Sequence, residues 1–422
     1  MIWKAVITLE ISKTGIAAIF IGTVLIAAAL TIIISRAFLK TSLSYTANGT
    51  PGISFEVIEL PTSAAFELVS SIGVGWNLGN ALDTRDDHRR GIVGDLTDIT
   101  PEEHYETYWG NPVTTFEMIE SIAQMGFGAV RIPVTYSDHL YDDFTIRPDW
   151  LNRVNQVVNY VLDNGMYAVI NLHHDTGMRS WLRAIPDNIE GIEEQLAAVW
   201  GQIAQYFINY CHRLIFEGFN EIRDLDGNWG SSDPASYNAV NRLNQVFVNT
   251  VRETGGNNAD RFLIVKTYAA STDIDSLRAF VLPYDSAHER LIVGVHNYGT
   301  LAFTWRQERA DWLTTYSDWS HTRDGIPVEE MLQRLYRYFV SMGIPVVICE
   351  FGAENKNNTL DRVNFATHYI QTAGRYGIAC FWWDDGGRHV NPEAVTNFAL
   401  FDRLRNQWFF PEIAMALVQA SR

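Results

Sequence analysis

Two glutamates stand where apolar runs of the sequence end. Glu350 closes the run VVICE at 346–350, and Glu221 closes FEGFNE at 216–221. A lone carboxylate in an apolar setting costs free energy unless it is paired or used, so either glutamate alone fits a structural ion pair equally well. Two carboxyl groups brought together suit cleavage of a glycosidic bond. One protonates the leaving oxygen, and the other attacks the anomeric carbon or activates water.

Short β-rich runs alternate with longer helical patterns along the chain. Candidate strands lie at 73–76, 129–134, 167–172, 214–217, 262–265, 292–295, 346–349 and 379–382. Apolar residues at i, i+3 and i+4 predict helices between them, at 115–125, 150–164, 191–210, 237–253, 329–342 and 360–375. Eight strand–helix units favour a (β/α)8 TIM barrel, in the α/β class, over an open sheet. No Gly-x-Gly-x-x-Gly follows the first strand, which weakens a dinucleotide-binding alternative.

Polar and aromatic side chains end nearly every candidate strand. The clearest cases are the runs RIPVTY at 131–136, NLHHD at 171–175, NE at 220–221, HNY at 296–298 and WWDD at 382–385. The carboxyl ends of barrel strands meet on one face, where TIM-barrel active sites are built. We therefore expect residues that are far apart in the sequence to converge there.

Eight short motifs in one order carry a resemblance to a known family. They are GWNLGN at 75–80, WGNP at 109–112, VRIPV at 130–134, NLHH at 171–174, FNE at 219–221, HNY at 296–298, CEFG at 349–352 and FWWD at 381–384. Together they resemble glycoside hydrolase family 5, the large cellulase family of retaining (β/α)8 enzymes. The WGNP and WWD elements, with KNNT at 356–359, resemble subfamily 4 of endoglucanases, lichenases and xyloglucanases. The resemblance covers essentially the whole chain after residue 54.

The resemblance implies the catalytic roles. Glu221 matches the general acid/base, and Glu350 matches the nucleophile. Arg131 matches the arginine that keeps the nucleophile charged, because a nearby cation favours the carboxylate. Tyr298 matches the tyrosine that donates to the nucleophile. Asn220 matches the amide that bonds the sugar 2-hydroxyl, a contact that strengthens in the transition state.

Other positions match the family's supporting and sugar-binding residues. His173 and His296 match two histidines at the third and sixth strand ends. Trp383 matches the sugar platform, and Trp382 should then point the other way because neighbours in a strand alternate faces. The exchanged assignment, with Trp382 as the platform, stays open. Outer subsites are assigned to His174, Trp76 and Trp109, with core packing an equal alternative for each.

Four further carboxylates and a pair of adjacent histidines could also have a role. Glu217 is expected to pair inside the barrel, whereas Glu354, Asp384 and Asp385 are expected in solvated loops. The sequence His173-His174-Asp175 could suggest a metal site, but adjacent histidines at one strand end rarely both reach one ion. We therefore expect neither a metal nor another cofactor.

Composition narrows the class of protein. Hydrophobic residues make up 47% of the 422 residues and charged residues 19%, which excludes a disordered chain. The net charge of −17 repels phosphate, so nucleic acid is not an expected partner. The three cysteines, Cys211, Cys349 and Cys380, cannot all pair and show no zinc spacing, so we expect buried free thiols.

The amino-terminal segment indicates where in or outside the cell the protein lies. No charged residue occurs from 14 to 35, a stretch that spans ~30 Å as a helix, the thickness of a bilayer core. We favour an uncleaved anchor over a cleaved signal peptide; both place the catalytic domain outside the cell. The resulting organisation is an anchor or signal at 1–40, a linker at 41–54 and a catalytic barrel at 55–422.

The leading hypothesis is a retaining endo-β-1,4-glucanase that acts on β-glucan polysaccharides. The same fold and mechanism could act on xyloglucan, lichenan, xylan or mannan, because specificity resides in loops. A non-catalytic carbohydrate-binding barrel is the remote alternative. The oligomeric state stays open.

Overall fold

The computed structural model describes residues 44–45, 51–52, 58–86, 100–177, 180–308, 312–386 and 397–422. The chain divides into two compact units, Met1–Glu59 and Leu60–Arg422. In the first unit, β1 (Ser44–Tyr45) pairs antiparallel with β2 (Pro51–Gly52). The apolar segment at 14–35 and most of the linker at 41–54 lie outside the described residues. Among the helices that are described, none is long and apolar enough to cross a bilayer.

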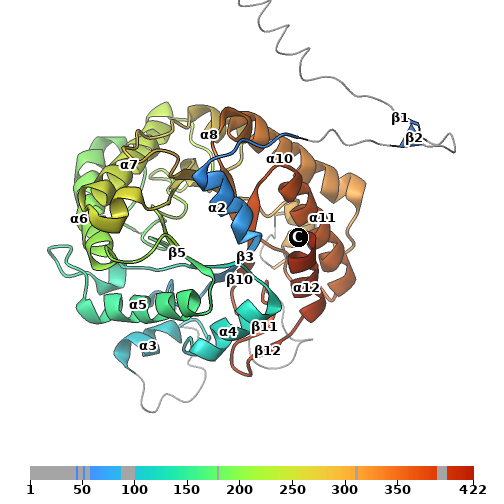
Figure 1. The fold of residues 1–422 in the computed structure, drawn as a ribbon, viewed down its shortest axis with the longest axis horizontal. Helices are drawn as coiled ribbons and strands as arrows, with labels where there is room; N and C mark the ends of the chain where they lie inside the picture. Colours follow the sequence, from blue (N-terminus) through green and yellow to red (C-terminus); the bar gives the residue numbers. More distant parts are fainter. Residues whose placement is uncertain are drawn as a thin grey trace, which may run out of the picture. The chain divides into compact units, whose positions relative to one another are not determined.

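Eight parallel strands of the second unit close into a barrel (Figure 1). They are β3 (Val74–Leu78), β4 (Ala129–Ile132), β5 (Tyr167–Asn171), β6 (Leu214–Glu217), β7 (Leu263–Lys266), β8 (Leu291–His296), β9 (Val346–Phe351) and β10 (Ala379–Asp384). Each strand pairs with the next along the chain, and β10 closes the barrel against β3. The TIM-barrel prediction is confirmed, with strand ends that differ from the predicted ones by a few residues.

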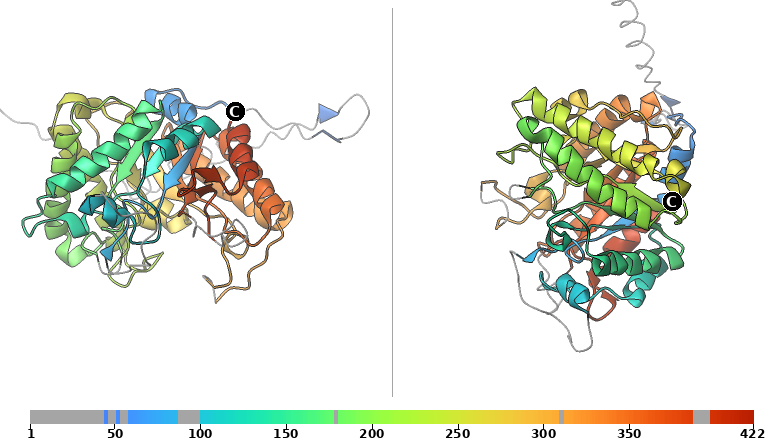
Figure 2. Two further views of the ribbon diagram at one scale, coloured as in Figure 1. Left: turned by 90° about the horizontal axis from the view of Figure 1, so that it is seen from below. Right: turned by 90° about the vertical axis from the view of Figure 1, so that its left-hand side faces the viewer.

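Helices surround the barrel (Figure 1). They are α2 (Ala64–Ile72), α3 (Pro101–Glu106), α4 (Phe116–Met125), α5 (Pro148–Asp163), α6 (Ile189–Tyr206), α7 (Pro234–Glu253), α8 (Ile274–Ala279), α9 (Leu301–Thr304), α10 (Ile326–Tyr338), α11 (Thr359–Arg375) and α12 (Pro411–Ala420). Short helical turns are η2 (Ser137–His139), η3 (Pro186–Asn188), η4 (Gly256–Asp260), η5 (Tyr268–Ala270), η6 (His321–Gly325) and η7 (Val340–Met342), and a hairpin joins β11 (Phe401–Asp402) to β12 (Gln407–Trp408). Figure 2 shows α6 and α7 side by side on the outside of the barrel.

Inward-facing residues change character along each strand. Near the amino ends they are apolar and form one cluster with α2; examples are Ala129, Val169, Ile215, Ile264 and Val347. Two residues further on, the same faces carry polar groups: Arg131 after Ala129, Asn171 after Val169, Glu217 after Ile215 and Lys266 after Ile264. The period-2 alternation of strands therefore builds an apolar floor beneath a buried polar layer.

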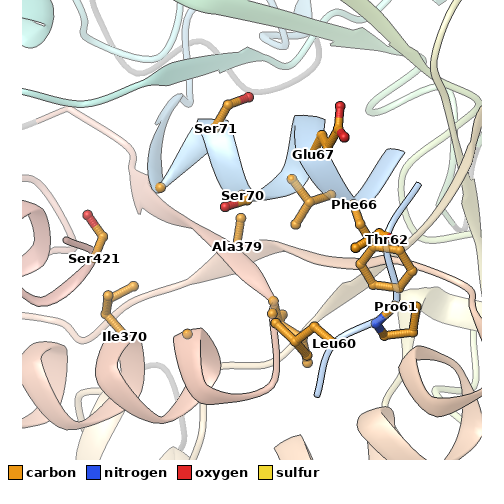
Figure 3. Close-up of a pocket in the computed structure, with 15 residues that line it drawn as sticks. Leu60, Pro61, Thr62, Phe66, Glu67, Ser70, Ser71, Ile370, Ala379 and Ser421 are labelled. Carbon is orange, nitrogen blue, oxygen red and sulfur yellow. The ribbon is translucent and has the colours of Figure 1, made fainter. Parts of the chain in front are cut away.

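A cavity of about 510 Å³ lies at the amino-terminal end of the barrel. Its lining includes Phe66 of α2, Ala379 at the start of β10 and Ile370 of α11 (Figure 3). None of the candidate site residues lines this cavity. The cavity is therefore at the end of the barrel opposite to the polar layer.

Capping residues fix where α4 begins and ends. The Thr115 hydroxyl accepts a hydrogen bond from the Met118 amide, and Gly126 ends the helix with φ 109°. A Cβ atom on Gly126 would lie 2.9 Å from Val418 of α12. Glycine is thus required here for both backbone conformation and packing.

Replacing this glycine gives a test of the packing between α4 and α12. Gly126→Ala should lower the free energy of unfolding by about 1 kcal/mol or more, because alanine resists positive φ and meets Val418. Gly374→Ala is the matched control: it lies in α11 with nothing near its added Cβ, and should stabilise the protein by about 0.5–1 kcal/mol. Urea unfolding measures both, and equal effects would contradict this account.

Candidate active site

Arg131 lies at the centre of the polar layer. Its side chain is fully buried and forms a bidentate ion pair with Glu217 at 2.7 and 2.8 Å. Its Nη1 donates to Glu350 at 2.7 Å and to Asn77 at 2.9 Å, and its Nη2 donates to Asn220 at 3.1 Å. All five guanidinium N–H donors are therefore used, which fixes the positions of Glu350 and Asn220.

Glu350 enters the site because β9 contains a bulge. Ile348 pairs with both Cys380 and Val295, but the next pairs join Glu350 to His296 and Phe351 to Trp382. Strand β9 thus carries one extra residue, so Cys349 and Glu350 both face inward instead of alternating. Glu350 Oε2 accepts a hydrogen bond from the Tyr298 hydroxyl at 2.9 Å. Burial raises the pKa of Glu350, while Arg131, Lys266 and Tyr298 oppose that rise.

Lys266 determines the hydrogen bonding of Glu221. Its buried ammonium lies 2.9 Å from Glu217 and 3.1 Å from Nε2 of His296. An ammonium group only donates, so Nε2 of His296 accepts and its Nδ1 carries the proton. Nδ1 then donates to Glu221 at 2.8 Å. Burial and the nearby cations hold the pKa of His296 well below its usual value, so the ring is neutral.

The three carboxyl groups have different environments. Burial alone would raise the pKa of Glu217, but Arg131 and Lys266 lower it to about 2. Burial, followed by the charge of Glu350, raises the pKa of Glu221 to about 8. At neutral pH Glu221 therefore holds a proton, while Glu350 accepts hydrogen bonds from Arg131 and Tyr298 as a carboxylate.

Glu221 and Glu350 face each other across a short gap. One oxygen of each, together with a ring nitrogen of His296, lies within 4.8 Å of the other two. Retaining glycosidases hold their carboxyl groups about 5–5.5 Å apart, and inverting ones ~6.5–9.5 Å apart. The nearest oxygens of the pair are thus closer together than the inverting spacing, as the retaining arrangement requires.

Residues around this pair offer hydrogen bonds and a flat apolar face. Asn220 turns its oxygen to Arg131, which leaves its NH₂ group to donate elsewhere. His173 receives a hydrogen bond on Nδ1 from Asn171, so its Nε2–H, 4.0 Å from Glu350, is the donor. Trp383 stacks on His173 with ring centres 5.8 Å apart, and Trp382 points outward to the Phe398 carbonyl, as alternation predicts.

His174 and Trp109 lie together beside this region. Their ring centres are 5.2 Å apart, and the Trp109 indole donates to the Arg85 carbonyl. The Nε2 atoms of His173 and His174 lie 4.0 and 3.6 Å from Asp83, so adjacent histidines do converge, on Asp83 rather than Asp175. Asp175 instead accepts from the Tyr136 amide and the Ser137 hydroxyl.

The prediction that Trp76 lines a sugar-binding subsite is wrong. This residue is 1% exposed and packs in the outer core, with the Arg403 guanidinium 5.2 Å from its ring centre. The reason is strand alternation: Asn77 contacts Arg131 inside the barrel, so its neighbour must face outward.

The prediction of solvated loops for three carboxylates is also wrong. Asp384 accepts from the Leu400 amide and from Arg403, and Asp385 accepts from the Phe398 amide. Glu354 is 3% exposed and accepts from the Arg306 amide. These carboxylates are buried because they satisfy amides of loops that fold over the barrel end. Cys349 and Cys380 are buried as expected, whereas Cys211 is exposed.

Lys266 was not among the site residues predicted from the sequence. It closes the apolar run of the fifth strand, just as Glu350 closes that of the seventh. A charged residue at that position was the available signal. The prediction that Glu217 pairs inside the barrel is confirmed, and Lys266 is one of its partners.

Comparison with known proteins agrees with this geometry. Residues 96–388 match the family model described as cellulase (glycosyl hydrolase family 5). The chain belongs to glycoside hydrolase family 5. It is therefore a glycoside hydrolase, and the resemblance seen in the sequence motifs is confirmed.

Three family members illustrate the similarity. Endoglucanase A of Ruminococcus albus is 37% identical over 372 residues, which cover 86% of this chain and 94% of that protein. Cellulase/esterase CelE of Acetivibrio thermocellus is 39% identical across 85% of this chain, but the chain spans only 40% of that protein. A GH5-4 broad specificity endoglucanase from Ruminococcus champanellensis with bound cellotriose has a TM-score of 0.75 at 37% identity, covering 86% of this chain and 100% of that one.

The charges around Glu221 predict how its pKa responds to substitution. In the wild type Glu221 should titrate with a pKa of about 8. The titration can be followed by NMR of ¹³C-labelled glutamate, and the Glu221 signal is the one that disappears in Glu221→Gln. Glu350→Gln should lower this pKa by removing a repelling charge. Lys266→Met should raise it by removing an attracting one. Shifts of the same sign in both variants would contradict the assigned electrostatics.

Proposed function

We propose that this family 5 chain is a retaining endo-β-1,4-glucanase that hydrolyses β-glucan polysaccharides by double displacement. The observation that carries the proposal is the facing pair Glu221 and Glu350, with oxygens within 4.8 Å of each other and with Arg131 and Tyr298 donating to Glu350. The relationship to endoglucanases supports the substrate class.

In the first step Glu350 is the nucleophile and Glu221 the acid. The Glu350 carboxylate attacks the anomeric carbon, while Glu221 gives its proton to the leaving glycosidic oxygen. Arg131 and Tyr298 hold the Glu350 oxygens, so the attacking group is positioned before substrate arrives. The covalent glycosyl–Glu350 ester no longer carries a negative charge.

In the second step Glu221 becomes the base. Loss of the Glu350 charge removes a cause of the raised pKa of Glu221, which favours its ionised form. The Glu221 carboxylate, held by His296 Nδ1–H, takes a proton from water as the water attacks the anomeric carbon. The ester bond breaks, Glu350 leaves as a carboxylate, and the product keeps its configuration.

The side chains around Glu221 and Glu350 would bind the sugar rings. The free NH₂ of Asn220 suits the 2-hydroxyl at the reacting sugar, and the Nε2–H of His173 offers a second donor. Trp383 supplies an apolar face for a sugar ring, and Trp109 with His174 extends the surface.

A broader substrate range is a second candidate for the same mechanism. The likeness to a GH5 family lichenase and to a xyloglucan-specific endo-β-1,4-glucanase favours action on lichenan or xyloglucan besides cellulose-type glucan. Xylan and mannan stay alternatives because specificity resides in loops. The alternative of a binding protein without activity is disfavoured because the complete set of Glu221, Glu350, Arg131 and Tyr298 is assembled. The apolar stretch at 14–35 supports export, with the chain secreted or anchored and its barrel outside the cell.

The pH profile should show which carboxyl group is protonated. Glu221 must hold a proton, so kcat/KM on a soluble β-glucan should fall as pH rises through about 8. Glu350 must be ionised, so kcat/KM should also fall when pH drops through its own pKa. An alkaline limb below pH 6 would contradict the proposed acid.

Substitution should separate the two roles. With the full chain in detergent, Glu350→Gln should abolish reducing-end release from carboxymethyl-cellulose, lichenan, xyloglucan, xylan and mannan. Glu221→Ala should lose about 10²–10⁴-fold on these polymers but less on an aryl cellobioside, whose leaving group needs no proton. Azide should then restore turnover of Glu221→Ala and give a β-glycosyl azide.

Glu67→Gln is the matched control, since this exposed residue lies on α2 at the opposite end of the barrel and should leave activity unchanged. Full activity of Glu350→Gln would exclude the proposed mechanism.

A further inference from the structure

A second cluster of ionisable side chains lies on elements that cover the outside of the barrel. His321 begins η6, Glu329 lies in α10 and His368 in α11. Helices α10 and α11 lie side by side in Figure 1, and η6 contacts both. None of these three residues takes part in the active site described above.

The three side chains converge. One nitrogen or oxygen of each lies within 4.8 Å of the other two. Nε2 of His368 is 3.6 Å from Oε1 of Glu329, and the imidazole centres of His321 and His368 are 5.1 Å apart at an interplanar angle of 76°. Two imidazoles and a carboxylate at this spacing are a donor set that suits zinc.

The backbone leaves an open point between the two rings. A Cβ atom added to Gly325 would lie 2.7 Å from Nδ1 of His321 and 3.0 Å from Nε2 of His368. Both nitrogens therefore lie beside Gly325. Nε2 of His368 is 3.3 Å from the Gly325 carbonyl, which only accepts, so this nitrogen carries the proton of the neutral ring. A metal ion bound there would replace that hydrogen bond and leave the proton on Nδ1. Gly325 is the last residue of η6, which is a π-helical turn. Such turns are rare and often occur at functional sites.

We propose that His321, Glu329 and His368 bind one divalent transition-metal ion, with zinc as the best fit. Atoms within 4.8 Å of one another all lie within about 2.8 Å of a common point, against zinc bonds of about 2.0–2.2 Å. Small side-chain rotations, with the loss of the hydrogen bond from Nε2 of His368 to the Gly325 carbonyl, therefore complete the site. His321 is exposed and Glu329 partly so, which opens a path for the ion and for a water ligand.

A metal at this position would act as a structural clamp. It would join η6 to α10 and α11, and so hold the end of the segment 297–320 that follows strand β8. That strand carries His296, and Tyr298 lies just beyond it. Because the ion binds only the folded state, it should raise thermal stability without contacting Glu221 or Glu350.

The test is zinc binding to the untagged full chain in detergent, in a Cys211→Ser background that removes the exposed thiol. Calorimetry with zinc chloride should give one site per chain, and zinc should raise the unfolding temperature. His321→Asn and His368→Asn should each weaken binding at least 10-fold and remove the thermal shift. Glu329→Gln should weaken binding less, because an amide oxygen remains.

Two matched histidine controls locate the ion. His288→Asn removes an exposed histidine beside a single glutamate and should change nothing. His174→Asn tests the other converging set, Asp83, His173 and His174. Binding lost only in His174→Asn, binding that survives in both His321→Asn and His368→Asn, or no saturable binding at 1 mM zinc chloride would each overturn the proposal. Because His321 is exposed, its variant keeps the fold and the test remains decisive.

Discussion

Charge balance in the buried polar layer is the constraint on which the site depends. Two cations, Arg131 and Lys266, lie among three carboxyl groups: Glu217 and Glu350 are buried in this layer, and Glu221 lies at its edge with a side chain 20% exposed. In a low-dielectric interior the set is balanced when one carboxyl group is protonated. Glu217 contacts both cations and Glu350 contacts one, so the proton belongs on Glu221. When Glu350 becomes an ester, Glu221 can ionise and the balance is kept.

The barrel provides this layer through strand alternation. Inward positions are apolar at the amino ends, where α2 covers them, and charged two residues later. Burial makes these ion pairs depend strongly on geometry, because an unmatched charge here would cost free energy. Arg131 meets this demand by using every donor of its guanidinium group.

The sequence predicts the barrel and most of the site because both depend on periodicity and on polar residues at strand ends. The β9 bulge was not predictable, because an extra residue in a strand leaves no mark in a short apolar run. The position of Trp76 was predictable in principle, since it lies between the inward-facing Gly75 and Asn77. The burial of Glu354, Asp384 and Asp385 depends on distant loops that supply the amides, which no local pattern reveals.

The identity of the nucleophile is the claim that the rest of the account requires. Incubation of the full chain with an activated 2-deoxy-2-fluoro-cellobioside should trap the glycosyl–enzyme ester, because the fluorine slows the second step more than the first. Peptide mass mapping should then find one fluorocellobiosyl group per chain, on Glu350. A label on Glu221, or no label together with a product of inverted configuration, would contradict the account.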